Sequence, residues 1–192
     1  MSLPEPSPRK HLHTRAIEYK GFEREDGLWD IEAHMTDVKT YEFTNNWRGT
    51  VEVGEPLHEM LLRLTIDDNF EIRDVEAATE NSPFKMCPDI APNYKSLIGI
   101  SMGPGWRKAI RTKVGGTEGC THLTELLFPM ATVAMQTIWP VKAQRRKKPV
   151  EEQNSSRRPP ILDTCHAWAS DSPVVRDNAP KFYTGTDPVE DS

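Results

Sequence analysis

The sequence predicts an α+β domain in which an antiparallel sheet of three or four strands carries helices on one face. Three observations predict this class. Residues 29–36 alternate between apolar and polar side chains, residues 62–77 have the pattern of a hairpin, and beyond residue 87 the apolar spacing becomes helical. Strands followed by helices within residues 11–140 are typical of a single α+β unit.

A period of two predicts the first strands. Residues 13–22 are β-prone, although Gly21 interrupts their alternation. Residues 29–36 alternate without a break, which predicts one buried face and one solvated face. The polar residues on the solvated face include Asp30, Glu32 and His34.

The middle of the chain predicts a turn-rich segment and a hairpin. Residues 44–54 contain adjacent asparagines and two glycines, which favour turns. Two apolar runs then flank Asp67-Asp68-Asn69, a sequence suited to a tight turn. We therefore expect residues 62–77 to pair as antiparallel strands.

Three helices are expected in the second half. The first begins near Cys87-Pro88 and ends at Gly103-Pro104-Gly105, and the second covers residues 106–112. The third extends from residue 117 or 119 to residue 139, and Pro129 within it predicts a kink or an offset start. Its stripe of Leu and Met is typical of a helix packed on a core.

Composition divides the chain into five parts. Residues 11–140 form the predicted single domain, after a disordered start at 1–10. A basic linker rich in Pro and Ser is expected at 141–160, an apolar docked segment at 161–169, and a disordered acidic tail at 170–192.

Charge, hydropathy and cysteine content exclude several classes of function. A net charge of −5 argues against nucleic-acid binding, and the basic cluster at 145–148 is either a solvated linker or a polyanion contact. No apolar run is long enough for a membrane helix, and residues 1–10 do not have the pattern of a secretory signal, so we expect neither feature. Three cysteines do not make a disulfide framework, so we expect a cytoplasmic protein. With charge and hydropathy taken into account, we expect a small-molecule substrate and no nucleic-acid or membrane partner.

Three metal-ligating side chains stand at the ends of predicted elements. His58 opens the hairpin, Cys87 follows it, and Cys120 begins the long helix, so the three could converge at one end of the sheet. A helix N-terminus also favours the thiolate of Cys120. The alternative is that the cysteines are buried as small apolar residues.

Acid–base and anion-binding groups form a second set. Asp30, His34 and Asp37 form one cluster in this set. Asp30 and His34 share a strand face, where a carboxylate can tune an imidazole as a general base, and the alternative is a solvated strand face. His122 lies near Cys120 and is either a proton-transfer group or a polar cap. Arg15 and Arg24 could bind a substrate carboxylate, or could pair with acidic residues on neighbouring strands.

Five strings in the chain carry a resemblance to a known family. They are His13-Thr14-Arg15, Arg24-Glu25-Asp26-Gly27-Leu28-Trp29-Asp30, Gly54-x-Pro56-x-His58, Gly119-Cys120-Thr121-His122-Leu123 and Asp163-Thr164-Cys165-His166. Over about residues 11–168 the chain resembles the bacterial family known as domain of unknown function 2889. This resemblance implies no particular activity, and it leaves the roles of Cys165 and His166 open.

A second resemblance covers roughly residues 50–138, which are similar in pattern to the U-type iron–sulfur cluster scaffold fold. That family has a Gly-x-Pro-x-Cys element, a hairpin, a second Cys and a third Cys that opens a long helix. Here His58 replaces the first Cys, and Met60 replaces the acidic residue two positions later. The resemblance, so altered, implies a single Zn²⁺ or Fe²⁺ ion held by His58, Cys87 and Cys120.

The leading hypothesis from the sequence is a metal-dependent enzyme of small-molecule catabolism. The ion would be held by His58, Cys87 and Cys120, and proton transfer would fall to Asp30, His34 or His122. The substrate would be a small organic molecule, for example a carboxylate or an aromatic compound, and the reaction type is left open. The alternatives are an iron–sulfur or metal carrier and a non-catalytic interaction module.

Overall fold

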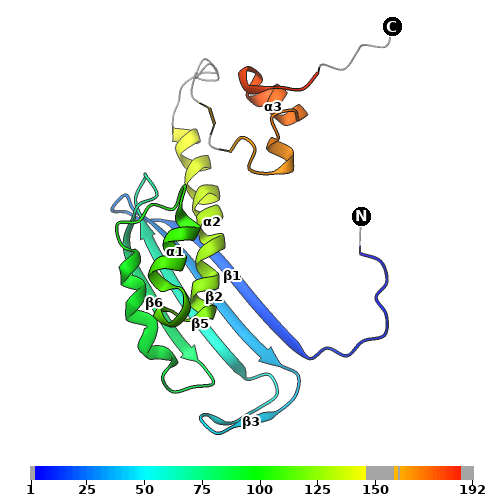
Figure 1. The fold of residues 1–192 in the computed structure, drawn as a ribbon, viewed down its shortest axis with the longest axis vertical. Helices are drawn as coiled ribbons and strands as arrows, with labels where there is room; N and C mark the ends of the chain where they lie inside the picture. The colour runs from blue at the N-terminus through cyan, green and yellow to red at the C-terminus, as the bar shows by residue number, and fades with distance from the viewer. Residues whose placement is uncertain (1–2, 146–157, 160, 187–192) are drawn as a thin grey trace. The chain divides into compact units, whose positions relative to one another are not determined.

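A computed structural model describes residues 3–145, 158–159 and 161–186. The chain divides into two compact units, Met1–Lys142 and Ala143–Ser192, which are described separately. The first unit has the expected α+β fold, in which a four-stranded antiparallel sheet is accompanied by helices (Figure 1).

The sheet is built from four long strands in the order β1-β2-β5-β6. Their bounds are β1 (His13–Glu23), β2 (Trp29–Lys39), β5 (Pro56–Ile66) and β6 (Ile72–Asn81). Each strand is antiparallel to its neighbours, so the sheet is a meander. The hairpin expected around Asp67-Asp68-Asn69 is the β5–β6 pair.

The turn-rich segment forms a small hairpin of its own between β2 and β5. Its strands are β3 (Phe43–Asn45) and β4 (Gly49–Val51), which pair with each other in a separate two-stranded sheet. The side chain of Asn45 accepts hydrogen bonds from the backbone N–H groups of Trp47 and Arg48, which fixes the turn.

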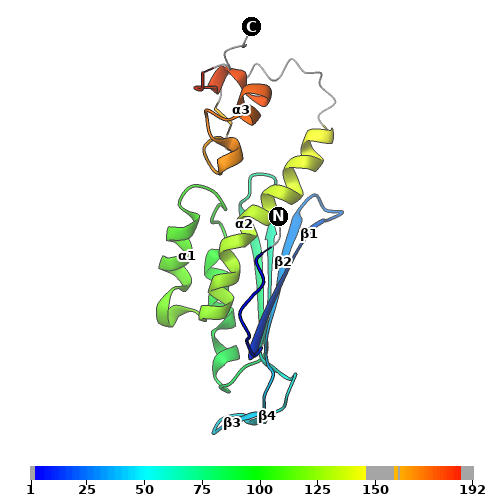
Figure 2. The same cartoon turned by 90° about the vertical axis from the view of Figure 1, so that its right-hand side faces the viewer.

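The helices of the first unit lie on one side of the sheet (Figure 2). They comprise the 3₁₀ helix η1 (Cys87–Leu97), α1 (Trp106–Val114), the short η2 (Gly116–Glu118) and α2 (Thr121–Arg145). The α2 helix thus continues beyond residue 139 and passes through both Pro129 and Pro140. None of the described helices combines the length and the hydropathy that crossing a bilayer requires.

The core fills the space between the sheet and the helices. Alternate residues of β2 and β5 are buried on this face. Most of their neighbours on the other face are partly or fully exposed, and Thr65 is the buried exception within β5. The helices cover the core on the side opposite the sheet. The indole N–H of Trp106 donates to the backbone carbonyl of Leu127 and so joins α1 to α2. The most completely buried side chains include Ile31, Met35, Met60, Leu64, Tyr94, Ile110, Leu123 and Leu126.

Gly21 lies where α2 packs directly against β1. The residue lies within β1 and pairs with Ile31, so the strand is continuous through it. A Cβ atom at Gly21 would overlap with the side chain of Thr137 on α2. The glycine that interrupts the apolar alternation in the sequence is therefore a contact site for the helix.

The second unit contains short helices around a small apolar cluster. They are η4 (His166–Trp168), α3 (Pro173–Asn178) and η5 (Pro180–Phe182). The two later helices thus lie in the stretch that was expected to be a disordered tail. The cluster of buried residues is formed by Leu162, Val175 and Ala179. Of the predicted linker at 141–160, residues 146–157 and 160 lie outside the described residues.

Candidate metal centre

A row of polar side chains crosses three strands at one end of the helix-covered face. Arg15 pairs with Asp37 between β1 and β2, and Asp37 pairs with His58 between β2 and β5. Paired residues of antiparallel strands project from the same face. Asp37 lies two residues after the buried Met35, and His58 two residues before the buried Met60, so both project from the face of the sheet that carries the core.

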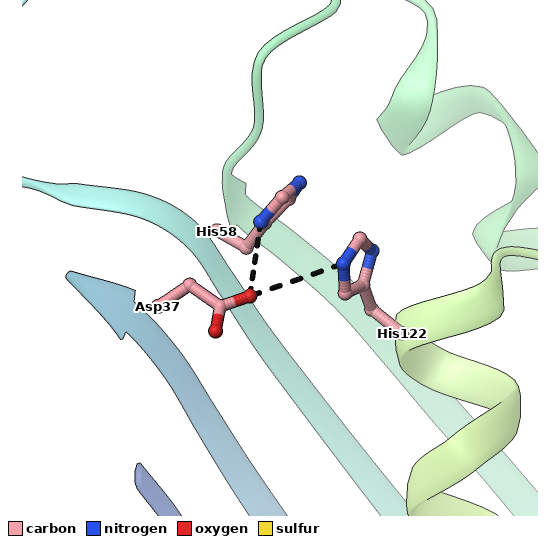
Figure 3. A group of neighbouring side chains, drawn as sticks. All are labelled: Asp37, His58 and His122. Carbon is pink, nitrogen blue, oxygen red and sulfur yellow. Dashed lines mark hydrogen bonds and ion pairs between the residues drawn. The ribbon is translucent and has the colours of Figure 1, made fainter. Parts of the chain in front are cut away.

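The N-terminus of α2 places further side chains near this row. His122 lies in the first turn of the helix and points toward Asp37 and His58 (Figure 3). Cys120 directly precedes the helix, and its carbonyl accepts the backbone N–H of Thr124. Glu125, one turn along, forms an ion pair with Arg15, with Nη1 and Oε2 3.0 Å apart.

Asp37, His58 and His122 bring three ligand atoms within 4.8 Å of one another. The Oδ2 atom of Asp37 lies 3.0 Å from Nδ1 of His58 and 3.8 Å from Nε2 of His122 (Figure 3). The two imidazole rings are 3.8 Å apart between centroids and tilted by 33°. We call these three residues the Asp–His–His cluster.

The carboxylate of Asp37 is almost completely enclosed, with 3% of the side chain exposed. Arg15 donates from Nε to Oδ1 at 2.9 Å and from Nη2 to Oδ2 at 2.8 Å, and Nε2 of His13 lies 2.8 Å from Oδ1. Burial alone would raise the pKa of Asp37, but the hydrogen bonds from Arg15 and His13 and the charge of Arg15 hold it far below its usual range. Asp37 is therefore an anion at neutral pH.

The neighbouring imidazole and thiol also have shifted pKa values. Burial lowers the pKa of His58, and the proximity of His122 lowers it further, against the opposing charge of Asp37. Burial raises the pKa of Cys120, but the contact with Nδ1 of His122 at 3.8 Å and the backbone N–H groups of Leu123 and His122 bring it below its ordinary value.

One carboxylate and two imidazoles suit a divalent transition metal ion. At metal–ligand distances of about 2.0–2.2 Å, neighbouring ligand atoms in a tetrahedral site lie roughly 3.3 Å apart. The contacts of 3.0 and 3.8 Å from Asp37 Oδ2 bracket this spacing. Three protein ligands would leave at least one coordination position open for water or substrate.

A family model described as "Protein of unknown function (DUF2889)" matches residues 13–136. The chain belongs to this family. The matched segment begins at His13 and ends within α2, so it contains every residue of the Asp–His–His cluster. Comparisons with curated proteins and with solved structures found no match, and the expected likeness to the U-type scaffold is not confirmed.

Of the three metal ligands expected from the sequence, His58 alone belongs to the Asp–His–His cluster among the described residues of the DUF2889 domain. Cys120 stands beside it, in contact with Nδ1 of His122, but outside the group of three. Cys87 is the first residue of η1 and is half-buried. Within the part of the chain that the structure describes, Cys87 joins no such group of ligand atoms.

The expected proton-transfer residues separate into two places. His122 belongs to the cluster, whereas Asp30 and His34 project from the opposite face of the sheet. On that face Asp30 accepts from the hydroxyl of Thr65 at 2.6 Å, and Nε2 of His34 lies 3.0 Å from Oε1 of Glu59. Asp30 and His34 therefore cannot exchange protons directly with a ligand bound at the cluster.

The two arginines expected to bind substrate lie at opposite ends of β1. Arg15 is at the cluster, where its guanidinium is engaged by Asp37 and Glu125. Arg24 follows β1 at the other end and pairs with Asp26 and Asp30. Arg15 thus fixes the orientation of the Asp37 carboxylate, and Arg24 braces the β1–β2 turn.

Sequence reasoning grouped Asp37 with the solvated residues Asp30 and His34, and it did not consider His13 as part of a site. The signal that identifies Asp37 is its position, because it follows Met35 by two residues and so falls on the buried face. A carboxylate at a buried position requires partners, and those partners define the site. Cys165 and His166 lie in the second unit, where both are exposed.

Proposed function

We propose that the DUF2889 domain is a metal-dependent enzyme for a small organic substrate and that Asp37, His58 and His122 bind its divalent ion. The observation that supports this most is the convergence of three ligand atoms from β2, β5 and α2 around one enclosed carboxylate. Zn²⁺ and Fe²⁺ both accept one carboxylate with two imidazoles. Zn²⁺ is the first choice, because it accepts four-coordinate sites with three protein ligands.

Each residue around the ion would have a distinct task. Asp37 supplies negative charge, and Arg15 and His13 fix its orientation through hydrogen bonds to both oxygens. Arg15 is anchored in turn by Glu125 on α2, so the carboxylate from the sheet and the imidazole from the helix are linked. This bracing keeps the ligands in place, as supporting residues of metal sites generally do.

The bound ion would act as a Lewis acid, polarising a substrate oxygen or lowering the pKa of a bound water molecule. His122 and His58 are the less enclosed ligands, with side chains 23% and 14% exposed. We therefore expect substrate to approach from the side of these two rings rather than from the side of Asp37.

The first test is metal binding by the full-length protein after treatment with a chelator. Titration with Zn²⁺ in a calorimeter should give one site per chain. Replacing His58 or His122 by Gln should weaken binding by about 100-fold or more, the upper end of the loss that follows removal of a residue that only orients a ligand. His34→Gln is the matched control, because it alters an imidazole on the opposite face of the sheet and should leave the affinity unchanged.

Cys87→Ser separates this ligand set from the one expected from the sequence. It should retain Zn²⁺ if Asp37, His58 and His122 are the ligands, and lose it if Cys87 ligates. Loss of binding in Cys87→Ser, or full binding in both His58→Gln and His122→Gln, would contradict the assignment.

The second test asks whether a coordination position is open. Co²⁺ replaces Zn²⁺ in many sites and has visible absorption bands that depend on its ligands. Adding azide or acetate should change these bands if an exogenous ligand can reach the ion. A spectrum that neither anion alters would indicate a closed, structural site and would count against an enzyme.

A further inference from the structure

A groove between α1 and α2 lies apart from the Asp–His–His cluster and has a different chemistry. Both figures show the two helices side by side in the helical layer (Figures 1 and 2). The groove has a volume of about 630 Å³, which falls within the range of small-molecule sites. Its α1 side carries Arg107, Lys108 and Arg111, and its α2 side carries Phe128, Ala131 and Thr132.

The α1 side is strongly cationic in an otherwise acidic protein. The chain has a net charge of −5, yet α1 contains two arginines, two lysines and no acidic residue. Among the residues that the structure describes, none of Arg107, Lys108 and Arg111 has an ion-pair partner, and all three are exposed. These side chains are available to an external anion.

The spacing of these cations suits a phosphate group. Arg107 and Arg111 are four residues apart, and Lys108 is three residues before Arg111, so all three lie on adjoining parts of one helix surface. Guanidinium groups bind phosphate oxygens through paired hydrogen bonds, and a lysine adds a point charge. Three positive charges match a ligand that carries two or three negative charges.

The α2 side offers an apolar surface next to the cations. Phe128 and Ala131 are half-buried, and the guanidinium of Arg107 stands 5.4 Å from the centre of the Phe128 ring. The small side chain of Ala131 leaves room beside that ring. A ligand with a flat organic group could therefore lie against α2 while its phosphates face α1.

We propose that this α1–α2 groove binds a phosphorylated small molecule with a flat organic group, of the nucleoside diphosphate type. Arg107, Lys108 and Arg111 hold the phosphates, and Phe128 and Ala131 contact the organic group. The site is separate from the proposed metal centre, so either proposal can fail while the other holds.

The test is calorimetric titration of the full-length, chelator-treated protein with ADP, with pyrophosphate and adenosine as its two halves. ADP should bind at one site and more tightly than either half. Arg107→Gln and Arg111→Gln should each weaken ADP binding by about tenfold, the loss of a charge-assisted hydrogen bond. Lys113→Gln removes the same charge from the same helix but lies outside the groove, and it should leave ADP affinity unchanged.

Four results would overturn the proposal. The first is that ADP does not bind at millimolar concentration, and the second is that ADP and pyrophosphate bind with equal affinity. The third is that Lys113→Gln weakens ADP binding as much as Arg111→Gln does. The fourth is that His58→Gln abolishes ADP binding. The last result would place the ligand at the Asp–His–His cluster instead. The substituted residues of α1 are exposed, so the variants should fold, and circular dichroism provides the check.

Discussion

Asp37 is an almost completely enclosed carboxylate, and its oxygens lie within hydrogen-bond distance of four nitrogen atoms. Arg15 occupies one position on each oxygen, His13 occupies a second position on Oδ1, and His58 a second position on Oδ2. A carboxylate offers about four such positions, so all of them are filled. A metal ion would take the place of the hydrogen bond between Asp37 and His58, while Arg15 and His13 remain.

Asp67 shows how a single carboxylate fixes a turn, and its contribution should depend on pH. Burial would raise its pKa, but the hydrogen bond from Arg73 and the backbone N–H groups of Glu71 and Asn69 lower it below the ordinary value. The ionised form therefore stabilises the fold above the unfolded-state pKa of about 4, and this stabilisation is lost as pH falls through the lower folded-state pKa.

We expect Asp67→Asn to lower the free energy of unfolding by about 1 kcal/mol at pH 7, since a charge-assisted contact is lost while a side-chain acceptor remains. At pH 2.5 the difference from the unaltered protein should be smaller. Urea unfolding at both pH values measures this, with Glu25→Gln as an exposed control. An equal or larger difference at the lower pH would refute the explanation.

For single residues, the sequence indicates which side chains lie near the candidate site better than it indicates which side chains contact one another. The spacing of element ends identified His58 and Cys120 as residues near one end of the sheet. Register decides which strand residues face one another, and the pairing of Arg15, Asp37 and His58 depends on contacts between distant segments. The order of residue types along the chain does not give this pairing. The alternation in β2 does, however, place Asp37 on the buried face, where a carboxylate requires partners.

The α2 helix illustrates an element whose path depends on one small residue in another element. The helix passes over β1 at Gly21, where the side chain of Thr137 leaves no space for a side chain on the strand. Glycine normally weakens a strand, so its presence in the middle of β1 is explained by the helix rather than by the sheet.

Replacing Gly21 by Ala should therefore destabilise the domain by about 1–3 kcal/mol, the usual cost of overpacking. In a strand without such a contact, the same change would be neutral or stabilising. Gly103→Ala is a suitable control, because the nearest atom to its new Cβ would be 3.8 Å away. Unfolding midpoints in urea give the comparison, and an unchanged midpoint for Gly21→Ala would show that α2 can move aside.

The apolar period predicted the existence of the helices more reliably than their type. Residues 87–97 have helical spacing, but the segment forms the 3₁₀ helix η1 and contains Pro88 and Pro92. Proline removes a backbone donor and obstructs a regular α-helix in the interior of a segment, which favours short, tighter turns. In α2 the longer apolar face maintains a continuous helix despite Pro129 and Pro140.

For the whole molecule, the division into units predicts that the first folds alone. Its core cluster, including the residues packed against it, ends at Val141, and α2 ends at Arg145. A fragment of residues 1–145 should have the near-ultraviolet circular dichroism expected of a packed core and a melting temperature within about 3 °C of that of the full chain. A drop of about 10 °C or more would mean that the first unit depends on the second.

The fold class was predictable because it follows from local patterns that occur in order along the chain. The inserted β3–β4 hairpin was expected only as turns, since strands of three residues are too short to show a period. The helices η4, α3 and η5 were not expected, because their apolar residues are few and widely spaced. Short elements of this kind depend on contacts rather than on periodicity.

The row formed by Arg15, Asp37 and His58 also protects the sheet against mispairing. If β2 slipped by one residue, Asp37 would turn outward and the charged side chains of Asp30 and Glu32 would enter the core beneath α2. Such an alternative would carry unpaired buried charges and would be strongly disfavoured. The residues that assemble the candidate centre would thus also select the correct alignment of strands during folding. Substitutions there would therefore favour misfolded and aggregated forms in addition to removing the proposed metal ligands.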